Sequence, residues 1–334
     1  MLRIAIDAMG GDHAPDEIVV GTISALQANE QLSVLLVGPT ERLEELLAPV
    51  DARIRQRITI VHASEVITND EAPAMAVRRK KDASIVVATR LLKEGEADGL
   101  LTAGSTGAFM AAGLLILGRL PGVQRPALAP ILPTVDGNGV VLLDVGANMD
   151  ATPDHLLQYA IMGSIYAEQV LGRPKPRVGL LNVGSEPGKG NEVVKAAFEL
   201  LSGQPLNFIG NLEARDLLAG AADVVVADGF VGNVVLKFME GMALGLFTML
   251  QEEFTSDLRS KLGAGLLLPG LKRFKRKLDY SEHGGAPLLG VKAPMIKCHG
   301  SSKGRAIHNG IYQAVKFIEN RSGEVISRTI GEVK

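Results

Sequence analysis

Short apolar runs alternate with helical patterns along most of the chain. Six of these runs end in small or polar residues and glycine, and each precedes a segment with helical spacing. They cover residues 4–6, 100–103, 140–143, 178–181, 224–226 and 295–298. Strands that alternate with helices predict an α/β fold with a largely parallel sheet covered on both faces. Because ligands bind beyond the carboxyl ends of such strands, the six loops are expected to form one shared rim.

The stretch Leu100–Leu117 shows this design most clearly. Its strand ends at Gly104, and an unbroken apolar segment follows Gly107. Ser105 or Thr106 is expected to cap a helix that is apolar almost all round, as in a helix packed inside a layered domain. The first-turn N–H groups of such a helix lack helical partners and favour an anion, phosphate above all.

Further elements complete the pattern. The strands are expected at 2–7, 33–37 and 57–61, and the helices at about 14 onward, 40–48, 73–94 and 153–170. The helical pattern at 73–94 carries four consecutive cations, residues 78–81. We interpret these cations either as a solvated face or as part of an anion-binding surface.

The regular alternation ends after Asn233, and residues 234–280 predict a helical excursion. A long helix is expected over 234–254, followed by a hairpin at 255–280 made of two short amphipathic helices. Their apolar turn would contain Leu266, Leu267, Leu268 and Leu271, inside a collar of Arg259, Lys261, Lys272, Arg273, Lys275 and Arg276. An apolar turn with a basic collar fits the interface of an anionic membrane. The same cations would suit an acidic protein, and the leucines would also suit a dimer core.

Composition narrows the class of protein. The chain has 334 residues with 46% hydrophobic and 22% charged residues, which is typical of a globular protein. This length permits one large α/β domain or two lobes that share a sheet. The formal charge of −2 gives no indication of a nucleic-acid partner. Cys298 is the single cysteine, so no intramolecular disulfide forms, and a cytoplasmic location is expected. No apolar run was expected to approach the ~20 residues needed to span a bilayer.

Several familiar sites are excluded by their spacing. Residues 184–190, GSEPGKG, are one residue short of a mononucleotide P-loop, and no dinucleotide G-x-G-x-x-G follows the first strand. Residues 300–304 fit G-x-S-x-G, but no acid and histidine follow in the order that a nucleophile elbow requires. Cys298 at a strand end is more typical of a buried small hydrophobe than of a nucleophile. Asp7, Asp12 and His13 are explained as well by capping and phosphate contact as by a metal, so neither a metal nor a cofactor is expected.

What remains is a phosphate-binding rim without a covalent nucleophile. Inorganic phosphate is itself a competent nucleophile, provided that the protein holds it, aims it at a carbonyl and stabilises the developing oxyanion.

Eight motifs carry a resemblance to a known family. They are IAIDAMGGDHAP, LLTAGSTGA, RPALAPILPT, LLDVGAN, LLNVGSEPGKGNE, NLEARD, VVVADGFVGNVVLK and GVKAPMIKCHGSS. Together they resemble the bacterial phosphate acyltransferase family, the acyl-acyl carrier protein:phosphate transacylases of phospholipid synthesis. The resemblance is collinear from residue 2 to about residue 317 and is weakest at 255–280.

The resemblance implies a fold and a reaction. The fold would be a three-layer α/β/α sandwich similar to the isocitrate and isopropylmalate dehydrogenases and to phosphotransacetylases, acting as a homodimer. The reaction would transfer a long acyl chain from acyl carrier protein to inorganic phosphate, and the acyl phosphate formed would serve glycerol 3-phosphate acylation. The enzyme would be cytoplasmic and peripherally bound to an anionic membrane.

The rim residues receive roles as a hypothesis, with a structural cap or turn as the alternative for each. His13 and His299 are the favoured proton carriers. The expected catalytic set is Asp7, His13, Lys189, Asn191, Asp228, Lys297 and His299. The expected phosphate-binding set is Gly10, Gly11, Gly104, Ser105, Thr106, Gly107, Asn182, Gly184, Gly188, Asn233, Ser301 and Ser302. A short-chain phosphotransacetylase using coenzyme A and a non-catalytic membrane scaffold are the competing interpretations.

Overall fold

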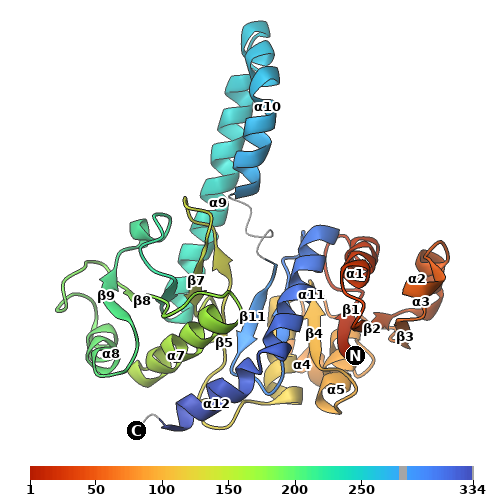
Figure 1. Cartoon of the computed structure of the whole chain (residues 1–334), viewed down its shortest axis with the longest axis horizontal. Coiled ribbons are helices and arrows are strands. Elements are labelled where there is room, and N and C mark those ends of the chain that lie inside the picture. Colours follow the sequence, from red (N-terminus) through yellow and green to blue (C-terminus); the bar gives the residue numbers. More distant parts are fainter. Residues whose placement is uncertain (278–283, 333–334) are drawn as a thin grey trace.

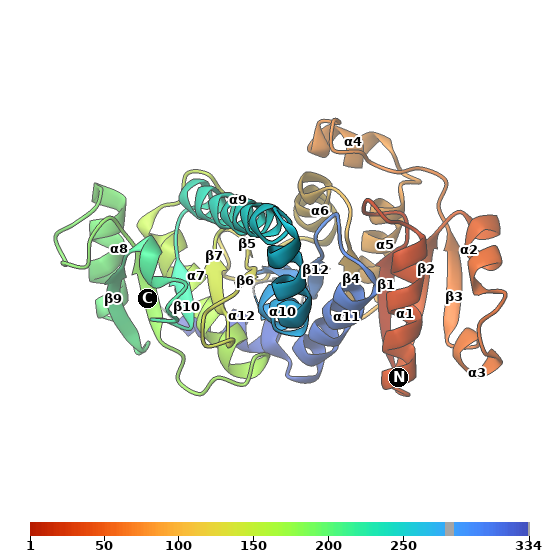
Figure 2. The same cartoon turned by 90° about the horizontal axis from the view of Figure 1, so that it is seen from above.

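The strands divide between two sheets that lie side by side (Figures 1 and 2). The computed structural model describes residues 1–277 and 284–332. The larger sheet has seven strands in the order β3-β2-β1-β4-β12-β11-β5. Its strands are β1 (Leu2–Asp7), β2 (Leu32–Gly38), β3 (Ile58–His62), β4 (Gly99–Thr102), β5 (Ala127–Leu128), β11 (Ala286–Leu289) and β12 (Met295–Lys297). All pairs are parallel except those that β11 makes with β12 and β5.

The second sheet has five strands in the order β6-β7-β10-β8-β9. They are β6 (Ile131–Leu132), β7 (Val140–Leu143), β8 (Val178–Leu181), β9 (Phe208–Leu212) and β10 (Val224–Val226). Only the pair of β6 with β7 is antiparallel. The predicted α/β class with largely parallel strands is confirmed. The strands form two sheets, however, so the six loops predicted to share one rim are divided between two sheets.

Helices cover both sheets. They are α1 (Asp16–Ala28), α2 (Thr40–Leu47), α3 (Ala52–Arg55), α4 (Pro73–Arg79), α5 (Ser84–Lys93), α6 (Thr106–Ala112), α7 (Pro153–Gln169), α8 (Glu192–Ser202), α9 (Gly229–Phe254), α10 (Leu258–Lys277), α11 (Gly304–Glu319) and α12 (Ser322–Glu332), with a π-helix η1 (Gly113–Leu117) and a 3₁₀ turn η2 (Ala214–Asp216). Successive side chains of β1 point to opposite faces of the sheet and therefore belong to different hydrophobic clusters. Ile4 and Ile6 join the cluster that contains α1 and α11, whereas Ala5 joins the cluster that contains α5 and α6.

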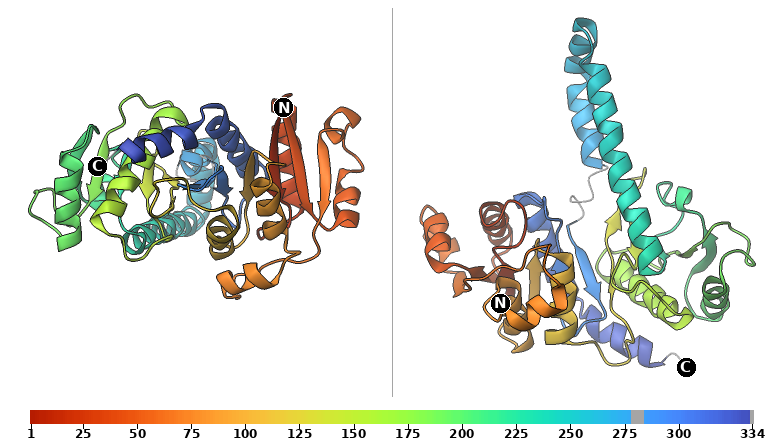
Figure 3. Two further views of the ribbon diagram at one scale, coloured as in Figure 1. Left: turned by 90° about the horizontal axis from the view of Figure 1, so that it is seen from below. Right: turned by 180° about the vertical axis from the view of Figure 1, so that it is seen from behind.

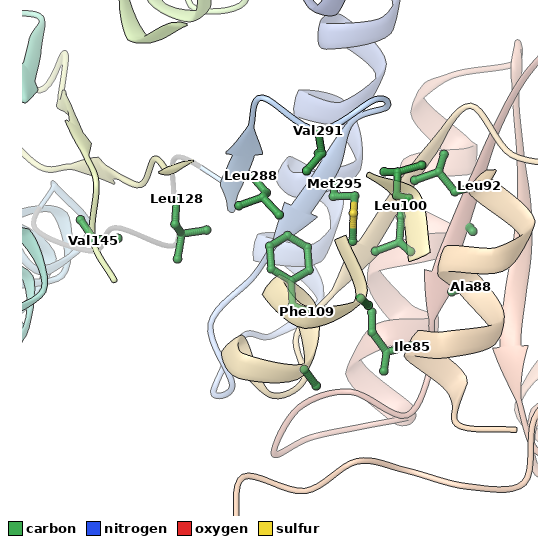
Figure 4. Packing of buried hydrophobic residues seen from close by; sticks show 14 of the residues in the cluster. Ile85, Ala88, Leu92, Leu100, Phe109, Leu128, Val145, Leu288, Val291 and Met295 are labelled. Carbon is green, nitrogen blue, oxygen red and sulfur yellow. The ribbon is translucent and has the colours of Figure 1, made fainter. Parts of the chain in front are cut away.

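One hydrophobic cluster connects the two sheets (Figure 4). Phe109 of α6 is fully buried and lies with Leu288 of β11 and Met295 of β12 in this cluster. The same cluster includes Leu128 of β5, at the edge of the larger sheet, and Val145, which follows β7 of the smaller sheet. The two sheets therefore share a core.

Two predicted helices differ from their sequence expectation. The helical pattern at 73–94 is two helices, α4 and α5, because the chain leaves the helix at Lys80 and turns before Ser84. The apolar helix after Gly104 is α6 continued by η1, and it is not buried all round. Leu114 and Leu115 are 40% and 46% exposed, so this helix presents an apolar side at the surface.

A helical hairpin of α9 and α10 projects from the body (Figures 1 and 3). The predicted apolar turn at Leu266–Leu271 is wrong, because α10 continues through it with Pro269 inside the helix. The true turn is the polar segment Thr255–Asp257, where Asp257 accepts a hydrogen bond from the Ser260 N–H at 2.8 Å and begins α10. Pro269 is tolerated inside α10 because water can satisfy the carbonyl that a proline leaves free on an exposed helix.

The expectation that no segment could span a bilayer also needs correction. Helix α9 is long and apolar enough by length and composition, with a mean hydropathy of 1.4 and 6% of its apolar window buried. It is the one such helix in the part of the chain that the structure describes. Its inner turns pack on the body through Val235, Leu236 and Met239, and its outer turns pack along α10, where Phe247 and Phe274 have ring centroids 6.0 Å apart.

Candidate active site

A polar cavity of about 460 Å³ lies at the carboxyl ends of β1, β4 and β12. Register explains why these ends meet, since Ile6 pairs with Leu101 and Lys297 pairs with Thr102. The backbone N–H of Asp12 donates to Gly300 at 2.8 Å and ties the loop after β1 to the loop after β12. Of the predicted residues, those that line the cavity are Asp7, Gly10, Gly11, Gly104, Ser105, Thr106, Lys297 and His299.

Asp7 organises the cavity floor. Its carboxylate is 2% exposed and accepts hydrogen bonds from the Thr102 hydroxyl at 2.7 Å and from the Met9 N–H at 3.2 Å. The Gly104 N–H in turn donates to the Thr102 hydroxyl at 2.9 Å. Burial raises the pKa of Asp7, and the hydrogen bonds from Ser84, Thr102 and Met9 and the charge of Lys297 oppose that rise. The carboxylate thus fixes the two glycine loops relative to each other.

Gly10 has to be glycine because the two loops touch there. A Cβ at this position would lie 2.6 Å from the Gly104 nitrogen and 2.7 Å from the Asp7 carboxylate. Gly11 has φ of +114°, which other residues rarely adopt. These two glycines let the loop after β1 lie flat against the loop after β4, so that backbone lines the cavity.

Lys297 places a cation in the cavity wall. The residue is 8% exposed, and its Nζ donates to the carbonyls of Ala103, at 3.3 Å, and of Cys298. Burial lowers the pKa of Lys297 to about 8, against the opposing effect of nearby Cys298, Asp7 and Asp12. At neutral pH the ammonium is therefore mostly charged and little hydrated, which favours interaction with a phosphate dianion.

His299 lies at the edge of the cavity. Its Nδ1 accepts the Ser301 N–H at 3.2 Å and lies 2.8 Å from the Ser301 hydroxyl. Because Nδ1 acts as an acceptor, the proton of the neutral ring is assigned to Nε2. Burial lowers the pKa of His299, with Glu240 raising it and Lys297 and Lys237 lowering it further. Burial thus favours the neutral ring, with its proton on Nε2 and its lone pair on Nδ1.

Seven of the predicted residues lie outside this cavity, on the smaller sheet: Asn182, Gly184, Gly188, Lys189, Asn191, Asp228 and Asn233. Asn182 donates to the Lys189 carbonyl at 3.0 Å and so closes its own loop. Asn191 caps α8 and Asp228 caps α9, by accepting the N–H groups of Val194 and Val231 at 2.9 and 2.8 Å. These contacts match the cap or turn alternative given for each residue.

Four more predicted residues also lie outside the cavity. His13 is exposed, and Gly107 allows α6 to approach Pro73, to which a Cβ would lie 2.5 Å. Ser302 is 4% exposed, and its hydroxyl has no hydrogen-bond partner among the described residues. Ser301 lines a neighbouring apolar cavity.

The structure adds cavity residues that the sequence did not single out. The loop after β3 contributes Val66, Ile67, Thr68 and Asn69, and α5 contributes Ser84. Helix α9 contributes Lys237, which pairs with Glu240 at 2.8 Å. Lys237 ends the motif VVVADGFVGNVVLK but received no role, and no motif marked the positions on the loop after β3 or Ser84. Within residues 1–277 and 284–332 no group of three or more His, Cys, Asp or Glu side chains is arranged to hold a metal.

Comparison with known proteins assigns the family. A family model described as fatty acid synthesis protein matches residues 2–324. A phosphate acyltransferase of Brevibacillus brevis is 54% identical over 98% of this chain and 97% of its own length. A phosphate acyltransferase of Bacillus cereus is 55% identical over 95% of this chain and 94% of its own length. The chain belongs to the phosphate acyltransferase family. It is accordingly an acyltransferase of lipid biosynthesis, whose substrates are phosphate and an acyl donor.

Solved structures of low sequence identity share the family's fold. A phosphotransacetylase from Streptococcus pyogenes matches with a TM-score of 0.63 and 19% identity over 95% of this chain and 94% of its own. A branched-chain phosphotransacylase from Enterococcus faecalis matches with a TM-score of 0.59 and 17% identity over 95% of this chain and 99% of its own. The predicted likeness to phosphotransacetylases is confirmed at the level of the fold.

Proposed function

We propose that this acyltransferase moves a long-chain acyl group from the thioester of acyl carrier protein to inorganic phosphate, forming an acyl phosphate for glycerol 3-phosphate acylation. The observation that carries the proposal is the buried Lys297 cation in a cavity lined by the glycine loops of β1 and β4. A dianion is the ligand that this combination favours, because the cation and the loop amides are both fixed and poorly hydrated.

The bound phosphate attacks directly in this proposal. A phosphate oxygen bonds to the thioester carbonyl carbon, the carbon–sulfur bond breaks, and the thiol of the carrier leaves. The proton of HPO₄²⁻ ends on that thiol, so the step balances without an added acid. We assign the relay of this proton to His299, whose neutral ring would give up its Nε2 proton to the leaving thiolate and take up the phosphate proton at Nδ1. Cys298 is unsuited to covalent catalysis, because it is fully buried and burial raises the pKa of its thiol to about 12.

The donor is tested by product analysis. The enzyme is incubated with labelled orthophosphate and with palmitoyl carrier protein or palmitoyl-coenzyme A. We expect a labelled, hydroxylamine-sensitive lipid from the carrier thioester. Turnover with short-chain acyl-coenzyme A alone would instead favour a phosphotransacetylase, and a stable acylated enzyme would contradict direct attack.

We also propose that the hairpin binds an anionic membrane. Leu266, Leu267 and Leu268 are 86%, 57% and 48% exposed on α10, and Arg259, Lys261 and Arg273 are exposed on the same helix. The side chains of Lys272, Lys275 and Arg276 lie outside the described part of the chain. Beyond its last residue packed on the core, Met239, α9 has residues 240–254, which rise roughly 22 Å at ~1.5 Å per residue, less than the ~30 Å hydrocarbon core. Surface contact from a cytoplasmic protein therefore fits the hairpin better than a crossing.

The membrane proposal has its own test. We expect Leu267→Glu to release the protein from anionic vesicles while activity in solution persists, and unchanged vesicle binding would refute the assignment. The basic side chains could instead receive the acidic carrier protein. In that case the Michaelis constant for the carrier would rise with salt in the absence of vesicles.

A homodimer is proposed from the exposed face of α9. Phe230, Val234 and Phe238 follow one another at spacings of four and are 63%, 53% and 66% exposed. An apolar stripe of this kind is more typical of a covered surface than of one in water. Light scattering should give twice the chain mass, and Val234→Glu should give the monomer.

A further inference from the structure

A second cavity, of about 510 Å³, adjoins the polar one and is lined mainly by apolar side chains. Most of its wall comes from α9, through Leu236, Met239, Ala243 and Phe247. The rest of the apolar lining comes from the same helix and from the side of the smaller sheet: Phe238, Met242, Leu244, Leu246, Leu132, Pro133 and Leu218. The stripe proposed for the dimer therefore reaches this cavity at Phe238. The volume lies within the ~300–1,000 Å³ typical of small-molecule sites.

The two cavities meet at His299, which lines both. One turn of α9 also contributes to both cavities. Lys237 lines the polar cavity, and Glu240 lines the apolar one. Their ion pair, at 2.8 Å, therefore marks the boundary between a charged compartment and an apolar one.

The apolar cavity also continues outward along the hairpin. Phe247 lines both this cavity and a groove between α9 and α10. That groove, of about 340 Å³, is lined by Leu250, Phe254, Leu268 and Leu271 among others. The cavity beside His299 and the groove on the outer part of the hairpin thus share one apolar wall residue, Phe247.

We propose that the apolar cavity holds the acyl chain of the donor, with the thioester at His299 and the phosphate in the polar cavity. This rests on the proposed function and adds a chain-binding site on α9 to it. An acyl phosphate has a charged head and an apolar tail, and two joined cavities of opposite polarity match that division. The occupant is the chain of the substrate, because the cavity shares His299 with the polar cavity proposed for phosphate.

The first test measures chain-length preference. In the wild-type enzyme, kcat/KM for acyl carrier protein should rise about fourfold per added methylene, or ~0.8 kcal/mol, until the cavity is filled. Ala243→Phe fills part of the cavity and should lower kcat/KM at least tenfold for palmitoyl while octanoyl stays within about twofold. The Michaelis constant for phosphate should not change.

The control is Met249→Phe, which places the same aromatic side chain on the same helix but outside the cavity lining. It should leave the length profile unchanged. If Ala243→Phe loses octanoyl and palmitoyl turnover equally while remaining folded, or if its length profile is unchanged, the proposal is overturned. If the wild-type enzyme forms no acyl phosphate from carrier thioesters of any length, the proposed function itself has failed.

A second measurement does not depend on turnover or on a bulky substitution. Ala243→Cys introduces a thiol into the cavity wall, and native Cys298 is fully buried and gives little background with N-ethylmaleimide. Palmitoyl carrier protein without phosphate should slow alkylation at least tenfold, whereas orthophosphate alone should not. Alkylation that responds only to protein concentration would mean that a second copy covers the cavity, and the proposal would be wrong.

Discussion

Replacing Lys297 with methionine separates two effects of this buried cation, its effect on folding stability and its effect on turnover with phosphate. The difference between the ordinary pKa of 10.5 and about 8 in the fold, at ~1.36 kcal/mol per pH unit, corresponds to roughly 3 kcal/mol of destabilisation at neutral pH. Methionine removes this cost but leaves the carbonyls of Ala103 and Cys298 without their donor, which costs roughly 1–1.5 kcal/mol each. Lys297→Met should therefore be within about 1 kcal/mol of wild-type stability, or slightly above it.

Activity should respond quite differently. Loss of a fixed, poorly hydrated cation from the phosphate site should lower kcat/KM for phosphate ~10²–10³-fold, the usual effect of removing one preorganised group. The assay is phosphate-dependent turnover of palmitoyl carrier protein, measured beside urea denaturation of the same preparations. Lys292→Met, an exposed change in the same segment, is the control and should alter neither quantity.

Folding stability and phosphate turnover should change in opposite directions as the pH rises. Because the folded pKa lies below the unfolded one, the folded state binds fewer protons between about pH 8 and 10.5, and stability from this group improves as pH rises through that window. Phosphate turnover should fall over the same window, since the cation is lost. A Lys297→Met enzyme that retains more than a fifth of wild-type activity, or that loses more than about 3 kcal/mol of stability, would refute the reasoning.

Three further predictions follow from the geometry. Gly10→Ala should abolish activity and lower the melting temperature, because its Cβ would lie 2.6 Å from the Gly104 nitrogen; a normal melting curve with full turnover would contradict the close approach. Lys189→Ala should leave the Michaelis constant for phosphate within twofold, since Lys189 lies outside the cavity, and a tenfold rise would return it to the site. Pro269→Ala should stabilise the hairpin, by up to ~3 kcal/mol, because α10 is continuous there, and circular dichroism should show no loss of helix.

The elements that the sequence predicted best are the buried parallel strands. The strand at 2–7 and the long helix from residue 153 agree with β1 and α7 within a residue, because a strand buried on both faces leaves a continuous apolar run. The division into two sheets was not predictable in this way. The division into two sheets depends on β5 and β6, and strands of two residues are too short to show an alternation of apolar and polar positions.

The site was predictable only where loops leave adjacent strands. The loops after β1, β4 and β12 were identified because glycine follows an apolar run, and register brings these three strands together. The loops after β8 and β10 have the same local pattern, but they belong to the other sheet. Local pattern cannot state which strands are neighbours. Lys237 was missed for the same reason, since a helix assigned to an excursion also reaches the cavity.

Helix α9 has a thermodynamic consequence. This single helix lines the polar cavity through Lys237 and ends at the hairpin turn at Phe254. If attachment of its outer end to vesicles changes the affinity of the inner end for an acyl donor, donor binding must change vesicle affinity by the same factor. Partitioning of the enzyme between vesicles and buffer would then report its substrate load, and acylated carrier protein would itself recruit the enzyme to lipid.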